Sequence, residues 1–281
     1  MKSITNKLKR SLLRLKHFAQ LKAVERRQSD TSLLRDVIAM LEPRVIDDVL
    51  IRAGSENDGG YLFPKSVSHQ DVLISPGVSW NSSFEAFFAD RGAICHLFDA
   101  SVDQPAALHE SFRFYPKFWG VSDSDDTIDA ANWLNSNLDR EQNNALQMDI
   151  EGAEYAVIDA LPDGIFSLFN LIIIEFHSFQ RILDPRYDDL YRRVFEKLTR
   201  DHRVVHFHPN NNITPVNFHG IAIPDCFEVT LVRRDNPKLS ERLSGFSPHP
   251  LDTPCVPEER EVSVNWDQIE KRTAITETTI E

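Results

Sequence analysis

Apolar residues along the chain fall into two patterns, continuous runs and stretches with helical spacing. Four runs have the length and composition of buried β-strands, at 71–78, 93–100, 145–150 and 171–176. Helical spacing is found in four stretches between or after these runs, at 82–92, 126–138, 153–161 and 187–201. Strands that alternate with helices predict an α/β fold with a parallel sheet and helices on both faces.

Three further runs add strands to this sheet. Residues 114–121 follow the second run and form a third strand along the chain. Residues 203–209 and 226–234 are separated by a polar loop, and their closeness predicts an antiparallel pair that closes one edge. Residues 247–281 contain several prolines and many acids, so we expect an extended or partly disordered tail.

The composition is that of a globular chain with a real core, since 41% of the 281 residues are hydrophobic. A formal net charge of −12 argues against binding to nucleic acid. The cysteines (Cys95, Cys226 and Cys255) are widely spaced and form no CxxC, so we expect neither a disulfide framework nor a cysteine-rich zinc site. A reducing cytoplasm fits this usage best.

Charge is concentrated at the amino terminus. Residues 1–30 hold nine Lys or Arg against two acids, a net charge of +7, which leaves −19 for the rest of the chain. Their leucines lie near helical spacing, but no apolar run approaches the ~20 residues of a membrane span, and the h-region of a signal peptide is missing. Two interpretations stay open: a solvated helix packed on the domain, or an amphipathic helix that binds an acidic partner or the inner face of a membrane.

Candidate functional residues follow the strands, because ligands of open α/β sheets bind beyond the carboxyl ends of the strands. Gly77 follows the first run in "SPGVSWNSS", where backbone N–H groups at the helix start suit an anion. This stretch is not a GxGxxG motif, and an ordinary strand–turn–helix connection is the commoner explanation. Asp99 lies 22 residues after Gly77, the spacing of an acid that holds a ribose diol, with a helix or turn cap as the alternative. Asp123 after the third strand suits the exocyclic amine of an adenine or, equally, a helix N-cap.

Acids and histidines gather after the next two strands. Asp149 and Glu151 end one strand, and Glu175 and His177 end the next. Buried carboxylates are costly unless paired, so we expect these groups to serve a ligand, a metal or a proton transfer. His206 and His208 lie two residues apart on a later strand, so their side chains point to the same face of the sheet. Such histidines are more often hydrogen-bonded structural or substrate-facing groups than metal ligands. A metal site is the less favoured alternative, with five candidate ligands: Asp149, Glu151, His177, His206 and His208.

The stretch "LQMDIEGAEYAVIDAL" (146–161) resembles the signature of the FkbM family of S-adenosylmethionine-dependent methyltransferases. The family pattern is K-x-D-[IV]-E-G-[AY]-E followed by a helix, and Gln147 stands here in place of the lysine. Further stretches resemble a subset of the family, related to the methyltransferase-like proteins, at 56–63, 77–85, 175–177 and 206–211. The resemblance covers about residues 50–235, and the first loop departs from it by holding few glycines.

The resemblance implies a Rossmann-like class I methyltransferase domain over residues 46–240. Its sheet would have seven mostly parallel strands in the order 3-2-1-4-5-7-6, with one antiparallel strand. Residues 1–45 would form a basic helical extension, and residues 241–281 an acidic tail rich in Pro and Thr. The implied reaction transfers a methyl group from S-adenosylmethionine to a hydroxyl of a sugar, a glycan or a small natural product.

The same resemblance implies site residues. The cofactor would be held by Gly77, Ser83, Glu85, Asp99, Asp123 and Asp149. Asp149 and Glu151 would lie where the methyl group and the acceptor meet, and carboxylates there suit the ammonium group of the cofactor. We favour His177 as the general base, with His208 and Glu151 as rivals.

Two alternatives to the enzyme stay open. A catalytically weakened protein of the same fold would serve as an interaction module, and the glycine-poor first loop favours it. Another nucleotide-using Rossmann enzyme is disfavoured by "MDIEGAEY" and by the missing GxGxxG. The acceptor is not readable from the sequence, because acceptor pockets are built from variable loops.

Overall fold

The computed structural model describes residues 32–218, 221–244 and 246–265. The basic segment 1–30 lies outside the described residues, as does the end of the expected tail, 266–281. None of the helices in the described part combines the length and the apolar composition of a membrane span.

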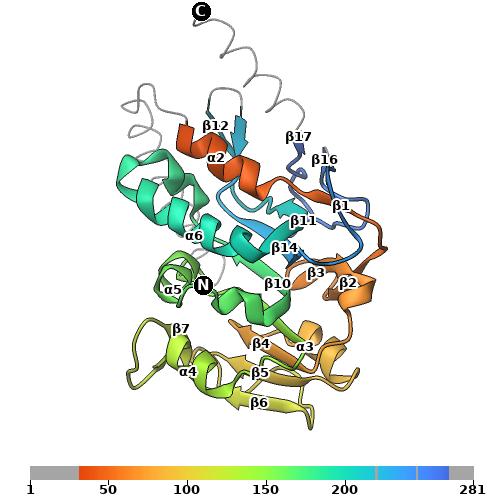
Figure 1. The fold of residues 1–281 in the computed structure, drawn as a ribbon, viewed down its shortest axis with the longest axis vertical. Coiled ribbons are helices and arrows are strands. Elements are labelled where there is room, and N and C mark those ends of the chain that lie inside the picture. Colours follow the sequence, from red (N-terminus) through yellow and green to blue (C-terminus); the bar gives the residue numbers. More distant parts are fainter. Residues whose placement is uncertain (1–31, 219–220, 245, 266–281) are drawn as a thin grey trace, which may run out of the picture.

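Seven strands form the central sheet, in the spatial order β6 (Phe112–Tyr115), β5 (Ile94–Phe98), β4 (Val72–Pro76), β9 (Asn144–Met148), β10 (Phe169–Phe176), β14 (Phe227–Arg233) and β11 (His202–Pro209). Figure 1 shows them from β6 at the bottom to β11 near the top. β14 is antiparallel to both neighbours, and the other neighbouring pairs are parallel. The expected antiparallel pair of β11 and β14 is confirmed.

The strand order depends on which strands are counted. In the numbering of all strands the order is 6-5-4-9-10-14-11, which differs from the expected digits because short strand pairs precede and interrupt the sheet. Counted along the chain within the central sheet alone, the order reads 3-2-1-4-5-7-6.

Helices cover both faces of the sheet, as expected (Figure 1). One face packs against α4 (Ala130–Asn137), α5 (Glu154–Ala160) and α6 (Asp188–Asp201). The other packs against α3 (Ser83–Ala89) and the hairpin of β2 (Leu50–Gly54) and β3 (Gly60–Pro64).

Alternate residues of each strand feed the two hydrophobic clusters. Ile74 and Leu146 belong to the cluster under α4, α5 and α6, whereas Leu73 and Ala145 belong to the cluster under α3. Because both faces are covered, the strands read as continuous apolar runs in the sequence.

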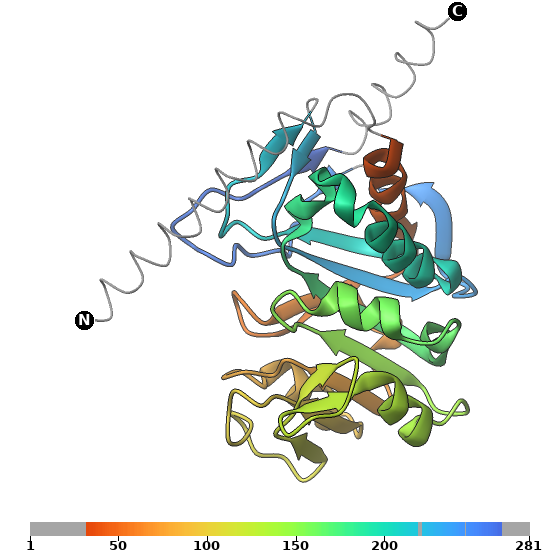
Figure 2. The same ribbon diagram turned by 90° about the vertical axis from the view of Figure 1, so that its left-hand side faces the viewer.

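The amino-terminal boundary expected at residue 45 is wrong for the described residues. α2 (Ser32–Leu41) packs on α6 and buries five apolar side chains in the main core: Leu33, Leu34, Val37, Ile38 and Leu41. β1 (Arg44–Ile46) pairs with β15 (Leu239–Leu243), so residues 32–46 are part of the domain. Figure 2 shows α2 beside the upper end of the sheet.

The segment after residue 240 also packs on the domain. β16 (Phe246–Ser247) pairs with β17 (Val264–Asn265), and between them Asp252 and Glu261 approach the histidines of β11. The described part of this segment is therefore held on the domain by buried polar contacts.

Two local predictions are corrected. The expected strand 114–121 is split, because Pro116, which has no N–H, separates β6 from β7 (Phe118–Gly120). β7 pairs with β8 (Thr127–Asp129), so α4 begins at Ala130, later than the helical stretch expected from residue 126. Its N-cap is Asp129, which accepts a hydrogen bond from the Asn132 amide.

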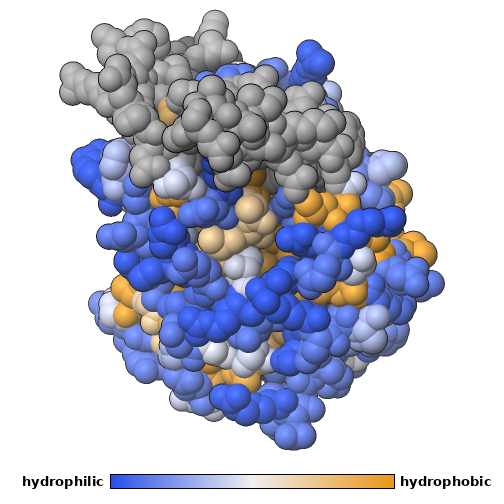
Figure 3. Space-filling view, turned by 45° about the horizontal axis from the view of Figure 1, so that its top comes forward, coloured by the Kyte–Doolittle hydropathy of each residue, from blue (hydrophilic) through white to orange (hydrophobic). Residues whose placement is uncertain are grey.

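The remaining elements are short. β12 (Val216–Phe218) and β13 (Ile221–Ile223) form a hairpin. In the part of the chain that the structure describes, four 3₁₀ helices lie in the connections: Lys65–Val67, Ile165–Leu168, Phe179–Leu183 and Pro185–Tyr187. In Figure 3 hydrophilic residues dominate the visible face of the described part, interrupted by groups of apolar residues.

Candidate functional site

A pocket lies where the strand order reverses, at the carboxyl ends of β4 and β9. The chain leaves these neighbouring parallel strands toward opposite sides of the sheet, which is the position of ligand sites in open α/β folds. The pocket is lined by the loop after β4, the loop after β9 and the β2–β3 hairpin, through Asp58, Gly59, Tyr61, Gly77, Val78, Ser79, Trp80, Asn81, Phe84, Glu85, Gln147, Asp149 and Glu151.

Gly77 lets the two loops touch. It has a φ of 92°, and a Cβ atom at this position would lie 1.6 Å from the carbonyl oxygen of Asp149. The Asp149 amide donates to the carbonyl of Pro76 at 3.1 Å, which ties the ends of β4 and β9 together. Glycine is therefore required here for packing between the loops, whatever the pocket binds.

Asp99 lies beneath the loop that follows β4. It is buried, and its two carboxylate oxygens accept the backbone N–H groups of Ser79 and Ser101, each at 2.7 Å. Asp99 does not line the pocket. Its contacts are those of a residue that shapes the loop, and its role toward a ribose stays a prediction.

The other expected cofactor residues differ in position. Ser83 is exposed at the start of α3 and bonds to Asn81. Asp123 accepts the amide of Asp129 in the turn before α4. Glu85 is buried and lines the pocket. A role in cofactor binding stays a prediction for all three.

Glu85 belongs to a buried polar network that the sequence did not reveal. The Ser75 Oγ atom lies 2.5 Å from Glu85 Oε1 and 2.7 Å from Gln147 Oε1, and Gln147 donates to the Tyr61 hydroxyl. The Ser75 hydroxyl has a single proton, so it can donate to only one of these two oxygens. The second hydrogen bond needs another proton, which a protonated Glu85 supplies. Burial raises the pKa of Glu85 to about 7, which favours that form.

Of the four residues expected to converge, Asp149, Glu151 and His177 do come together, and His208 does not. The Nε2 atom of His177 lies 3.9 Å from Asp149 Oδ1, 3.8 Å from Glu151 Oε2 and 3.8 Å from Glu175 Oε1. On the other side of the ring, Nδ1 lies 3.1 Å from Glu154 Oε1. His177 is thus surrounded by four carboxylates.

The neighbouring carboxylates stabilise the charged form of His177. Burial opposes the imidazolium form, but the hydrogen bond to Glu154 and the charges of Glu154, Asp149 and Glu175 outweigh it and raise the pKa of His177 to about 10. Burial, followed by the charge of Glu175, raises the pKa of Asp149. Burial, followed by the charge of Glu228, raises the pKa of Glu175 to about 7. The cluster therefore binds a proton more tightly than free side chains do.

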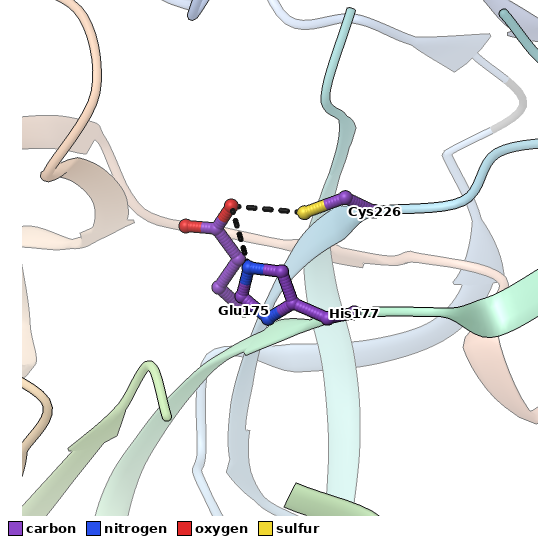
Figure 4. Close-up of side chains that lie close together, drawn as sticks. All are labelled: Glu175, His177 and Cys226. Carbon is purple, nitrogen blue, oxygen red and sulfur yellow. Dashed lines mark hydrogen bonds and ion pairs between the residues drawn. The ribbon is translucent and has the colours of Figure 1, made fainter. Parts of the chain in front are cut away.

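Glu175, His177 and Cys226 form the buried side of this cluster (Figure 4). The thiol of Cys226 donates to Glu175 Oε1 at 2.9 Å, and Asn210 donates to the same oxygen. Glu175 Oε2 is buried and has no hydrogen-bond partner among the described residues.

His206 and His208 are paired elsewhere. Both are buried on β11, where His206 Nε2 lies 2.9 Å from Asp252 and His208 Nε2 lies 2.8 Å from Glu261. Glu228 separates His208 from Glu175 across the sheet. Of the five metal ligands expected from the sequence, only Asp149, Glu151 and His177 form a group in the described structure.

Several residues of the cluster were missed. Glu154 is the last acid of the "MDIEGAEY" stretch and was a detectable candidate, but its position inside a helix reads as a solvated face. Glu228 is an acid within an apolar strand, which is a signal in retrospect. Asp58, which lines the pocket, and Cys226, which contacts Glu175, carry no local signal, because they reach the site from distant parts of the chain.

Comparisons with known proteins add little. No family model matches the sequence, and no curated protein matches it. A solved structure described as "Putative hemolysin from Streptococcus thermophilus" is 14% identical with a TM-score of 0.34, covering 72% of this chain and 82% of the other. A "Putative methyltransferase from antibiotic biosynthesis pathway" from Anabaena variabilis is 12% identical with a TM-score of 0.27, covering 52% and 61%. Such values carry no functional argument, and membership of the FkbM family stays a prediction.

Proposed function

We propose that this chain is an S-adenosylmethionine-dependent methyltransferase that acts on a hydroxyl group. The observation that carries the proposal is the pocket at the reversal point between β4 and β9, which Asp149 and Glu151 help to line. The strand order within the sheet and the "MDIEGAEY" resemblance support it.

The pocket residues fit the cationic end of this cofactor. S-adenosylmethionine has an ammonium group and a sulfonium group, and it supplies a methyl group that is ready for displacement. Asp149 lines the pocket with a side chain that is 23% exposed, so its carboxylate can be reached by a cation in the pocket. Asp149 would hold the ammonium group, and Gly77 would leave the backbone of its loop open to the cofactor.

The chain's own groups would position the acceptor hydroxyl and take its proton. His177 was the favoured base, but with a pKa of about 10 it already carries its proton at neutral pH. It is better suited to donating a hydrogen bond to the acceptor oxygen. Glu151 is 88% exposed at the pocket mouth and is the carboxylate placed to receive the proton. His208 is enclosed between Glu228 and Glu261, which argues against a role as base.

The proposed acceptor is a sugar, a glycan or a small natural product. Trp80 lines the pocket and is 72% exposed, so its indole offers a flat apolar surface beside polar groups. Small-molecule sites combine such surfaces with a few polar groups. Attachment of the basic segment 1–30 to an acidic partner or to the inner face of a membrane stays a separate prediction.

A binding module without catalysis is the second candidate, and Asp99 is the observation that favours it. Both of its oxygens are used by backbone amides, which leaves less capacity for a ribose. Replacing Asp99 with alanine would disturb the loop in either case, so that variant does not separate the candidates.

Calorimetric titration of the chelator-treated protein with S-adenosylmethionine and S-adenosylhomocysteine tests the proposal. We expect both ligands to bind. Asp149→Asn should weaken the binding of S-adenosylmethionine by about tenfold or more, since a charged hydrogen bond contributes about 1.5–3 kcal/mol. The matched control is Asp163→Asn, an acid 71% exposed beside Arg200. Absence of binding by the folded protein would favour the module.

A further inference from the structure

The ring of His177 is oriented so that one nitrogen faces three carboxylates. Its Nδ1 atom is held by Glu154, whose side chain is fully buried and whose Oε1 also accepts the amides of Ile150 and Gly152. Because Glu154 accepts a proton from Nδ1, the lone pair of the neutral ring lies on Nε2. A carboxylate that orients a histidine in this way is the usual outer partner of a metal-bound imidazole.

The distances around Nε2 leave room for an ion. The carboxylate oxygens of Asp149, Glu151 and Glu175 lie 3.8–3.9 Å from Nε2, beyond hydrogen-bond range. Nitrogen and oxygen ligands that each lie about 2.0–2.2 Å from one ion are separated by roughly 3–4 Å. The observed spacing is therefore that of ligands around a cation.

Unused carboxylate oxygens support the same conclusion. Glu175 is 3% exposed, and its Oε2 atom has no hydrogen-bond partner among the described residues. Asp149 Oδ1, which faces His177, is also buried and unpartnered. Buried polar atoms are nearly always bonded, so these oxygens call for a partner from outside the chain, and a metal ion is one such partner.

The backbone is strained at Glu151, one of the acids beside His177. Glu151 has a φ of 57°, a left-handed conformation that is uncommon for residues other than glycine, and Gly152 follows with a φ of 104°. Strained backbone of this kind is unfavourable and tends to gather at ligand sites. Here it places the Glu151 carboxylate beside His177.

We propose that Asp149, Glu151 and His177 bind one divalent transition-metal ion. One imidazole with carboxylates suits Mn²⁺, Fe²⁺ or Zn²⁺ better than Ca²⁺ or Mg²⁺. Three protein ligands leave positions open toward the pocket, which Asp149 and Glu151 also line. Glu154 is the positioning residue, and Glu175 adds negative charge behind the ion.

A second trio, Glu175, His177 and Cys226, shares the histidine. It is the weaker site, because the Cys226 thiol already donates to Glu175 and Asn210 bonds to the same carboxylate. It also lacks the exposed ligand through which an ion would enter, since Glu175 and Cys226 are both buried.

Metal binding does not depend on the methyltransferase proposal, but its catalytic consequence does. The ion would replace the proton of His177 and would release it to solvent. A hydroxyl bound to the ion would then lose its proton to water more readily, and Glu151 would act as a ligand instead of a base. In the metal-bound protein the acceptor hydroxyl would therefore not need His177, which is already protonated at neutral pH in the metal-free protein, as its base.

Calorimetry on the full chain tests the site without any methyl donor. After chelator treatment and dialysis, the protein is titrated separately with Zn²⁺ and Mn²⁺, and we expect one ion per chain. Glu151→Gln and His177→Ala should weaken binding at least about tenfold, and Glu154→Gln about 10–100-fold as expected for an outer partner. Cys226→Ala and Asp163→Asn should leave the affinity unchanged.

Each outcome decides the matter. Because Glu151 is 88% exposed, its glutamine variant should fold even if His177→Ala does not. Unchanged affinity in Glu151→Gln, or loss in Cys226→Ala alone, would overturn the assignment in favour of the buried trio. No binding by the folded parent protein would overturn the site altogether. Binding of S-adenosylmethionine by the chelated protein is measured separately, so the two proposals fail independently.

Discussion

The backbone at Gly77 lies directly against the carbonyl group of Asp149. A Cβ atom at position 77 would be 1.6 Å from that oxygen, a separation that no side chain can occupy. The contact joins the loop after β4 to the loop after β9, and it sets the shape of the pocket between them.

Gly77→Ala should therefore unfold or distort the pocket. The matched control is Gly92→Ala, since Gly92 has nearly the same φ of 96° but no atom within 4 Å of the added methyl group. Left-handed strain alone costs the control about 1–2 kcal/mol, whereas Gly77→Ala adds a backbone clash. Urea unfolding of both variants measures the difference. Equal losses would mean that the loops are not in contact.

Glu85 should make stability depend on pH. Its pKa is raised by burial from 4.5 to about 7, so the folded state holds a proton that the unfolded state has lost in this window. Stability should fall as the pH rises from about 4.5 to about 7, by on the order of 3 kcal/mol from this group. Glu85→Gln mimics the protonated form, so it should change stability little near pH 5 and raise it near pH 8. A variant that is equally destabilised at both pH values would show that Glu85 is ionised in the fold.

The contact between Asp252 and His206 should anchor the segment after residue 240. Both side chains are nearly fully buried, and Asp252 also accepts the amide of His249. Asp252→Ala should lower the free energy of unfolding by about 3 kcal/mol, because it leaves His206 buried without its partner. Asp235→Ala is the control. The Asp235 side chain is 66% exposed, so its ion pair with Arg233 should contribute less than about 1 kcal/mol. Equal effects would mean that the segment is not held in place.

His177 should titrate near pH 10 in the metal-free protein. NMR of its ring Cε1–H signal during a pH titration measures this directly. Because the folded pKa of about 10 exceeds the ordinary value of 6.5, the stabilisation from this group is complete below about pH 6.5 and is lost as the pH rises through 10. Glu154→Gln should lower the pKa, since it removes the strongest favourable partner. A titration midpoint near pH 6.5 in the parent protein would contradict the claim that nearby carboxylates stabilise the charged form of His177.

The sequence predicted the sheet because its strands are buried on both faces, which leaves a continuous apolar run. It also predicted that Asp149, Glu151 and His177 would meet, since each follows a strand end at the same edge. In these cases the sequence shows each strand and its end locally, and the parallel topology brings the strand ends together.

Other features depend on contacts between distant residues and could not be predicted. Asp252 and Glu261 come from a segment with the composition of a disordered tail, yet each pairs with a buried histidine of β11. This pairing also removes His206 and His208 from the expected metal set. Asp99 could not be recognised as a support of the Ser79 loop, because its partners are backbone amides.

Diffraction from crystals grown with S-adenosylhomocysteine tests the central claim most directly. The account predicts ligand density between the loop 77–81 and the strand end at Asp149, with the amino-acid end of the ligand toward that carboxylate. Density at another place on the protein, or an empty pocket at saturating ligand, would contradict it.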